Sequence, residues 1–199
     1  MAYCSTADVK TFAQGDVSDT SQDTLYADLI LSAAAIIDGY TGRTFEAADN
    51  TSRYFDALGD HIDGRSLFLW QEGVPTDLCA IDAITNGDGT TVTTSQYTTR
   101  PKGQTPFHEI RLLTSASIDW TYTTDWEDAI EISGKWAYSE TAPQRIKHAC
   151  IRLAAWLHRQ KDTMVDVSNP VLTANGQMIL PSRLPGDVRE LLRPYVRAF

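Results

Sequence analysis

Long apolar runs are missing from this 199-residue sequence. No stretch approaches the roughly 18 consecutive apolar residues that a bilayer-spanning helix needs. The N-terminal sequence MAYCSTADVK has no basic segment followed by an apolar one, so we expect no secretory signal peptide. The sequence therefore predicts a protein that does not insert into membranes.

Cysteine is scarce, and its three positions do not form a disulfide pattern. Cys4, Cys79 and Cys150 are far apart and odd in number, whereas a secreted disulfide scaffold has a dense, even-numbered set. We predict free thiols in a reducing compartment. Cys150 falls on the apolar side of a predicted helix and is expected to be a small core residue.

Catalytic and metal-binding motifs are also missing. The four histidines show no metal-ligand spacing, and there is no phosphate-binding glycine loop, Gly-x-Ser-x-Gly or Cys-x-x-Cys. Asp125, Glu127 and Asp128 surround Trp126, an arrangement that a glycoside hydrolase could use but that is more often a solvated loop. We predict no enzymatic activity, no metal and no cofactor, with a glycan hydrolase as an alternative.

Negative charge dominates, but unevenly. The chain has a net charge of −9; residues 1–60 and 61–141 each carry −7, and residues 142–199 carry +5. An acidic majority argues against a nucleic-acid-binding protein, which normally has a basic domain. The basic C-terminal quarter indicates a surface for an acidic partner or for the acidic part of a second copy.

Helical periodicity marks four segments. A short helix is predicted from a Ser5 cap to about residue 14, and a second helix follows at about 24–42. The second is apolar on so much of its circumference that we expect burial on more than one side. A long helix is predicted at 142–161, with Thr141 as its N-cap and Pro143 in its first turn. Its apolar stripe consists of Ile146, Ala149, Cys150, Leu153, Ala154 and Leu157.

The C-terminal region combines a loop and a fourth helix. Residues 162–183 contain Asn-Pro and Asn-Gly breaks, which predict a loop that is mobile or ordered by a partner. The following helix is expected to kink or end at Pro194. Its apolar side and its arginines suit docking on another protein, or packing against its own core.

Between the helices, the periodicity becomes that of strands. Candidate strands lie at 53–56, 66–70, 78–85, 90–94, 96–99, 108–113 and 129–136. The sequence Asn-Gly-Asp-Gly at 86–89 predicts a hairpin turn. Trp120, Tyr122 and Trp126 lie on a long connection at 115–128. They are either partly buried or form a contact patch, which leaves a carbohydrate-binding module as a second alternative.

These elements predict an α+β fold with an antiparallel β-rich insertion in a helical core. The expected boundaries are 1–50 and 140–162 for the helical core, 51–139 for the insertion, and 163–199 for the loop and docking helix.

Four motifs in order carry a family resemblance. They are YCSTADVKTFAQ near the start; AAAIIDGYTGRTF at 33–45 with RYFD at 53–56; ISGKWAYS at 132–139 with Pro143, Ile146-Lys147 and Ala149-Cys150; and LLRPYVR at 191–197. This layout resembles the head–tail connector (adaptor) family of tailed phages, whose members form the ring below the portal.

The resemblance implies a virion structural protein of the neck, assembled in the host cytoplasm as a ring of twelve copies. Its partners would be the portal protein on one side and the stopper or tail-completion protein on the other. DNA would pass through the lumen without specific binding, helped by acidic walls that repel phosphate.

The resemblance also implies two contact surfaces. The C-terminal helix is expected to dock on the portal, and the basic long helix is expected to meet the acidic helix of a neighbouring copy. The portal-docking residues would be Arg189, Leu191, Leu192, Arg193, Tyr195 and Arg197. The inter-subunit residues would be Arg145, Lys147, Arg152, Arg159, Asp28 and Asp38.

Overall fold

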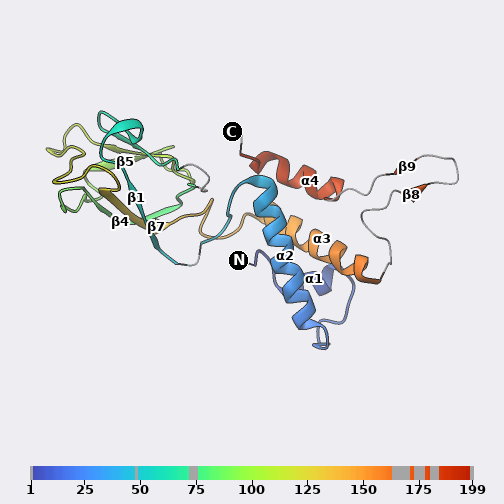
Figure 1. Ribbon diagram of the computed structural model, residues 1–199. Coiled ribbons are helices and arrows are strands. Elements are labelled where there is room, and N and C mark those ends of the chain that lie inside the picture. Colours follow the sequence, from blue (N-terminus) through green and yellow to red (C-terminus); the bar gives the residue numbers. More distant parts are fainter. Residues whose placement is uncertain are drawn as a thin grey trace. The chain divides into compact units, whose positions relative to one another are not determined.

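The computed structural model describes residues 2–47, 49–71, 76–162, 171–172, 178–179 and 184–197. The chain divides into two compact units (Figure 1). The helical unit comprises Met1–Gly42 and Pro143–Phe199, and the β unit comprises Arg43–Ala142. The chain therefore leaves the helical unit, completes the β unit and returns. The described residues form four α-helices and antiparallel sheets, so the predicted α+β fold class is confirmed.

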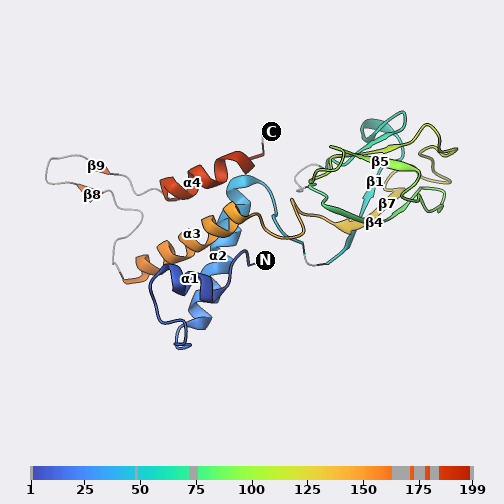
Figure 2. The same ribbon diagram turned by 180° about the vertical axis from the view of Figure 1, so that it is seen from behind.

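Helix α3 is the centre of the helical unit, because it contacts all three other α-helices (Figures 1 and 2). The helices are α1 (Thr6–Phe12), α2 (Asp23–Thr41), α3 (Gln144–Asp162) and α4 (Gly186–Leu192), and a 3₁₀ turn η2 (Arg193–Tyr195) follows α4. No helix of the described chain has the length and apolar character needed to cross a bilayer.

Local sequence explains several helix ends. The Ser5 side chain accepts a hydrogen bond from the Asp8 N–H (3.2 Å), and the Asp8 carboxylate accepts one from the Ser5 N–H (2.9 Å), so a capping box starts α1. Gly42 ends α2 in the left-handed region at φ 67°, where its N–H donates to the Asp38 carbonyl. Helix α4 gives way to η2 at Arg193, directly before Pro194, as predicted.

The start of α3 differs from the prediction. The helix begins at Gln144, and the Pro143 carbonyl accepts a hydrogen bond from the Lys147 N–H (3.0 Å). Thr141 therefore lies outside the capping position, and its prediction as the N-cap was wrong. Pro143 lies directly before the helix rather than in its first turn, and its fixed φ and missing N–H suit that position.

The two long helices pack through small and branched side chains. Helix α2 buries one face, and α3 buries Ile146, Ala149, Cys150 and Leu153 completely. The expected burial of α2 on more than one side was wrong for the single chain, since Leu31 is 51% exposed, Ile36 37% and Tyr40 39%. The buried residues of α2 are Tyr26, Ile30, Ala33, Ala34, Ile37 and Thr41.

Two antiparallel sheets form the β unit. The first has the order β1-β7-β4, and the second has the order β2-β3-β6-β5. The strands are β1 (Thr51–Phe55), β2 (Ile62–Asp63), β3 (Ser66–Phe68), β4 (Ala80–Thr85), β5 (Tyr97–Arg100), β6 (Glu109–Leu112) and β7 (Ile130–Lys135). Both sheets contribute to one apolar core, which includes Phe55, Leu67, Ile84, Ile110 and Ile132.

The predicted hairpin turn at 86–89 is present. The Asn86 N–H donates to the Thr90 carbonyl (2.8 Å), and Gly89 has φ 82°. The predicted strand at 90–94 is wrong, because only Thr91 forms a bridge, with Thr85. The other predicted strands match observed ones within a few residues.

Most of the predicted loop at 162–183 lies outside the described residues. Within it, β8 (Val171–Leu172) and β9 (Met178–Ile179) pair antiparallel. The expectation that a partner orders this loop stays a prediction.

Candidate interaction surface

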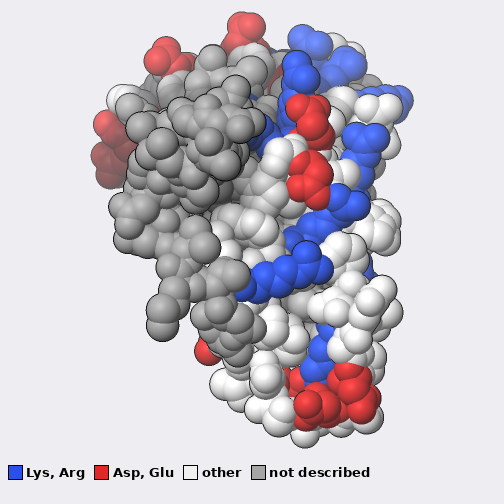
Figure 3. Space-filling view, turned by 90° about the vertical axis from the view of Figure 1, so that its right-hand side faces the viewer, with Lys and Arg blue, Asp and Glu red and all other residues white. Residues whose placement is uncertain are grey.

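A basic stripe follows the exposed side of α3. Arg145, Arg152 and Arg159 are seven residues apart, which is close to two helical turns, so they lie on one face. All three are exposed, and His148 is exposed between the first two. Figure 3 shows Lys and Arg side chains following one another down the face that it displays, with acidic groups among them.

Helix α4 adds acidic and apolar groups beside this stripe. An open hollow of about 550 Å³ lies between α3 and α4. Arg152 and Asp187 form an ion pair across it. Burial disfavours charge on Asp187, but the hydrogen bond and positive charge of Arg152, together with backbone N–H donors such as that of Val188, outweigh it and lower the pKa of the carboxyl. The lining residues are Arg145, His148, Arg152, Asp187, Glu190 and Leu191.

The residues predicted to dock on the portal fall into two groups. Leu192 is fully buried, with Val188, within its own helical unit. Leu191 is half-buried, and Arg189 and Arg193 are exposed. Tyr195 and Arg197 are half-buried, and the Arg197 N–H donates to the Thr41 carbonyl (3.0 Å). Helix α4 therefore packs on its own core and presents a polar side outward.

Several residues predicted at an inter-subunit contact have partners inside the chain. Lys147 pairs with Asp8 at 3.0 Å. Asp38 accepts a hydrogen bond from the Tyr3 hydroxyl (2.6 Å), and burial raises the pKa of its carboxyl, although this hydrogen bond opposes the shift.

Two other predicted residues keep their charge outward. Asp28 on α2 and Arg145 on α3 are both exposed, and neither forms an ion pair within the described part of the chain. They are thus available to a second copy.

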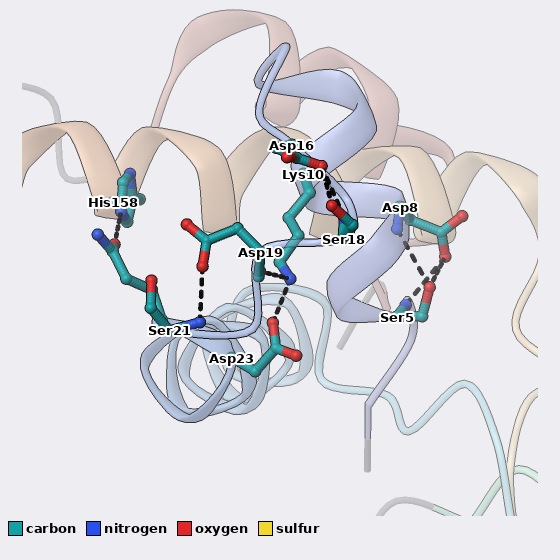
Figure 4. A network of polar contacts seen from close by, with 10 residues as sticks. Ser5, Asp8, Lys10, Asp16, Ser18, Asp19, Ser21, Asp23 and His158 are labelled. Atoms are coloured by element: carbon teal, nitrogen blue, oxygen red, sulfur yellow. Dashed lines mark hydrogen bonds and ion pairs between the residues drawn. The ribbon is translucent and has the colours of Figure 1, made fainter.

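A network at the start of α2 joins α1, α2 and α3 (Figure 4). Lys10 is buried, donates to the Asp19 carbonyl (2.5 Å) and pairs with Asp23. His158 of α3 meets Gln22 (3.1 Å). These contacts tie the chain segment that connects α1 and α2 to the helices.

The capping pair of α1 predicts a pH effect. The Ser5 N–H, the Ser5 hydroxyl and Lys147 lower the pKa of Asp8 below 3.8, although burial opposes them. The stability that this carboxylate supplies is therefore present above the ordinary pKa and lost as pH falls through the lowered one. Asp8→Asn should cost about 1 kcal/mol at neutral pH, and the difference from wild type should shrink in acid.

Urea unfolding at neutral pH and at a pH below 3.8 checks this expectation. Asp60→Asn, at an exposed position in the β unit, is the control and should cost little at either pH. An Asp8→Asn cost that is equal at the two pH values would contradict it.

The connection that carries the predicted aromatic patch is only partly buried. Trp120 is buried, and its indole N–H donates to the Arg65 carbonyl (3.0 Å). Tyr122 (39% exposed) and Trp126 (38%) are on the surface. Of the two alternatives, burial holds for Trp120, whereas Tyr122 and Trp126 are partly exposed, so the three side chains do not form one exposed patch.

The acids beside Trp126 lie in a solvated loop. Asp125, Glu127 and Asp128 are all exposed, and the Asp128 N–H donates to the Asp56 carboxylate (2.9 Å). Among the described residues, no three or more His, Cys, Asp or Glu side chains gather closely enough to hold a metal ion.

No protein-family model and no curated protein matches this sequence. Solved structures do match. One is a chain of the neck of an empty gene transfer agent (GTA) particle, computed with C6 symmetry, with 14% identity, a TM-score of 0.56 and coverage of 97% of this chain and 90% of that one. Another is a chain of the neck of a native GTA particle, computed with C12 symmetry, with 15% identity, a TM-score of 0.53 and coverage of 98% and 92%.

This chain shares the fold of those neck chains. The likeness covers nearly the full length of both partners, so it includes the helical unit and the inserted β unit.

Sequence reasoning missed exposed apolar residues on both units. On α2, Leu31 lies on one edge of the exposed side and Ile36 and Tyr40 lie on the other, and all three are exposed, although they were expected to be buried or were not singled out. The β unit exposes Trp70 (48%), which stacks on His61 with ring centroids 4.8 Å apart. The wide spread of apolar residues around α2 was a signal in the sequence that some of them are exposed. No such signal marked Trp70, because it falls in a predicted strand.

Proposed function

We propose that this protein is a structural component of the neck of a phage-like particle, with a structural rather than a catalytic role. In this proposal, copies form a ring between the portal and the stopper or tail-completion protein after assembly in the host cytoplasm. The observation that carries it is the fold likeness to two neck structures over nearly the whole chain. The order of the four sequence motifs supports the same assignment independently.

Contacts between copies are proposed to join α2 of one copy to α3 of the next. The exposed apolar side chains of α2 would supply buried area, and the acid Asp28 lies on the same helix. The facing surface would be the basic stripe of Arg145, Arg152 and Arg159. Two different patches of one chain then meet, which is the heterologous contact that closes a ring.

This assignment narrows the predicted inter-subunit set. Lys147 and Asp38 have partners within the chain and are half-buried, so we assign them to the stability of each copy. Arg152 also pairs internally, with Asp187, but is exposed and stays part of the proposed contact surface. Asp28 and Arg145 are the residues on which the charge complementarity of the contact depends.

Portal docking is proposed to use the outward side of α4 and η2. Arg189, Arg193 and the half-buried Leu191, Tyr195 and Arg197 are the contact residues. Leu192 is fully buried and acts indirectly, by holding α4 on the helical unit.

The β unit has the charge expected of a channel wall. Residues 43–142 contain seven Lys/Arg and sixteen Asp/Glu, a net charge of −9. Such a surface repels phosphate, so DNA would pass without tight contacts. We propose that acidic faces of this unit line the lumen.

Native mass spectrometry of the protein alone and mixed with its cognate portal tests the proposal. We expect a fixed number of copies to join each portal ring. That number is twelve if the ring has the C12 symmetry with which the native GTA neck was computed. No association with an intact portal ring would overturn it.

The proposed contact between copies makes a separate prediction. Ile36→Asp places a charge at an exposed apolar position of α2, so the monomer should keep its stability within about 0.5 kcal/mol. Stoichiometric ring formation should be lost, because the charge would be buried without a partner in the contact.

Leu58→Asp is the matched control, since Leu58 is an exposed apolar residue of the β unit (45%). It should leave the stoichiometry unchanged. A full ring with Ile36→Asp would remove the α2 contact but not the neck assignment.

A further inference from the structure

Two buried cysteines from distant parts of the sequence meet in the helical unit. The Cys4 and Cys150 sulfur atoms are 3.4 Å apart, although the residues are 146 positions apart in the chain. Cys150 is fully buried on α3, and Cys4, directly before the Ser5 cap, is 9% exposed. Both are free thiols.

Three contacts fix this arrangement. The neighbouring Tyr3 hydroxyl donates to Asp38 of α2, and Ser5 on the other side forms the capping box of α1. Asp8 then pairs with Lys147, less than one turn from Cys150 on α3. Cys4 therefore cannot swing away without breaking contacts on both sides of it.

The two thiols influence each other's acidity. The hydrogen bond from Cys4 to Cys150 is the main cause that lowers the pKa of Cys150 and raises that of Cys4. Burial raises the pKa of both and weakens the effect at Cys150. The pair thus favours a thiolate on Cys150 with the Cys4 thiol as its hydrogen-bond donor. Thiol–disulfide exchange proceeds from a thiolate.

We propose that Cys4 and Cys150 are an oxidation site that forms a reversible disulfide with oxidants of the small disulfide class, such as glutathione disulfide. Cys4, the one of the two with exposed surface, attacks one sulfur of the oxidant while the Cys150 thiolate accepts its proton, and the first reduced thiol is released. Cys150 then loses its proton and attacks the Cys4 sulfur of the mixed disulfide, which releases the second. Two protein thiols lose two protons and two electrons, and the oxidant becomes two thiols.

The disulfide would connect the N-terminal segment to α3 across the whole inserted β unit. A crosslink that closes such a long loop restricts the unfolded chain strongly, so the helical unit should become more resistant to unfolding. In a reducing compartment the thiols stay free, and the bond forms when the protein meets an oxidising solution.

Peptide mapping after oxidation tests the proposal. The full-length protein is incubated with glutathione disulfide, alkylated and digested without reductant. We expect a peptide pair linked through Cys4 and Cys150, lower in mass by two hydrogens, while Cys79 is still alkylated. The urea midpoint should rise on oxidation and return on reduction with dithiothreitol.

Two serine variants make the result specific. Cys4→Ser should lose both the linked peptides and the midpoint shift, and Cys79→Ser, the third buried cysteine, should keep both. Glutathione attached at Cys4 without linkage to Cys150, or both thiols still free while Cys79 is modified, would overturn the proposal. Neither result depends on whether the protein forms a neck ring.

Discussion

Reversing one charge on α4 and one on η2, Arg189→Glu with Arg193→Glu, is expected to weaken binding to the cognate portal by at least about 100-fold. The reason is that like charges at a complementary interface cost several kcal/mol. Both side chains are exposed, and Arg193 forms a long 3.8 Å ion pair with Glu190. Val188 and Leu192, fully buried, should hold α4 in place. Circular dichroism should therefore show an unchanged fold.

The control for this variant carries the same change of charge on the other unit. Arg100→Glu with Lys102→Glu alters two exposed basic residues of the β unit. Portal binding by native mass spectrometry and by titration calorimetry should survive in this control. Equal binding by wild type and the α4 variant would remove the docking surface from the proposal.

Gly134→Ala is expected to destabilise the β unit by about 3 kcal/mol or more, the upper range for a side chain forced into a packed site. A Cβ at this position would lie 2.3 Å from the Ala80 carbonyl oxygen and 3.0 Å from the Leu78 Cδ1. Gly134 is on β7, the central strand of its sheet, which is paired on both sides and cannot move outward.

Gly39→Ala should have the opposite sign. Gly39 lies on the exposed side of α2, and a Cβ there would meet nothing within 4 Å. Alanine should stabilise the helix by about 0.5–1 kcal/mol. Urea unfolding of both variants measures the contrast, and a Gly134→Ala cost under about 1 kcal/mol would show that the sheet yields at β7.

The elements that sequence predicted well depend on local chemistry. Ser5 and Asp8 form their capping box within four residues, and the Asn86 turn needs only its own four positions. The apolar stripe of α3 was equally readable, because its period of three and four residues determines its buried face. Each of these signals lies within about one helix or one turn.

The parts that sequence did not predict depend on distant neighbours. Which side of α2 is buried is decided by α3, more than one hundred residues later, so Ile36 could not be distinguished from Ile37. Residues 90–94 have the β-branched side chains that favour a strand. Among the described residues they pair only through the bridge between Thr91 and Thr85, which is too little to form one.

The candidate interaction surface likewise has a part that local sequence predicted and a part that depends on distant residues. The seven-residue spacing of Arg145, Arg152 and Arg159 is visible in the sequence, and so is a basic face. The ion pair of Arg152 with Asp187 requires α4 to fold back, which the sequence left open as an alternative to docking. Because Asp187 pairs with Arg152, less of the positive charge of the stripe is left to attract a second copy.

The insertion of the β unit into the helical unit sets an order of events at the ribosome. Residues 43–142 can fold as soon as they emerge, whereas α1 and α2 must wait for α3, which begins at Gln144. Until then the apolar face of α2 has no cover. A chain cut short before α3 would contain a finished β unit but would lack α3 and α4, and with them the basic stripe and the proposed portal-docking surface. Only complete translation products could then join an assembled ring.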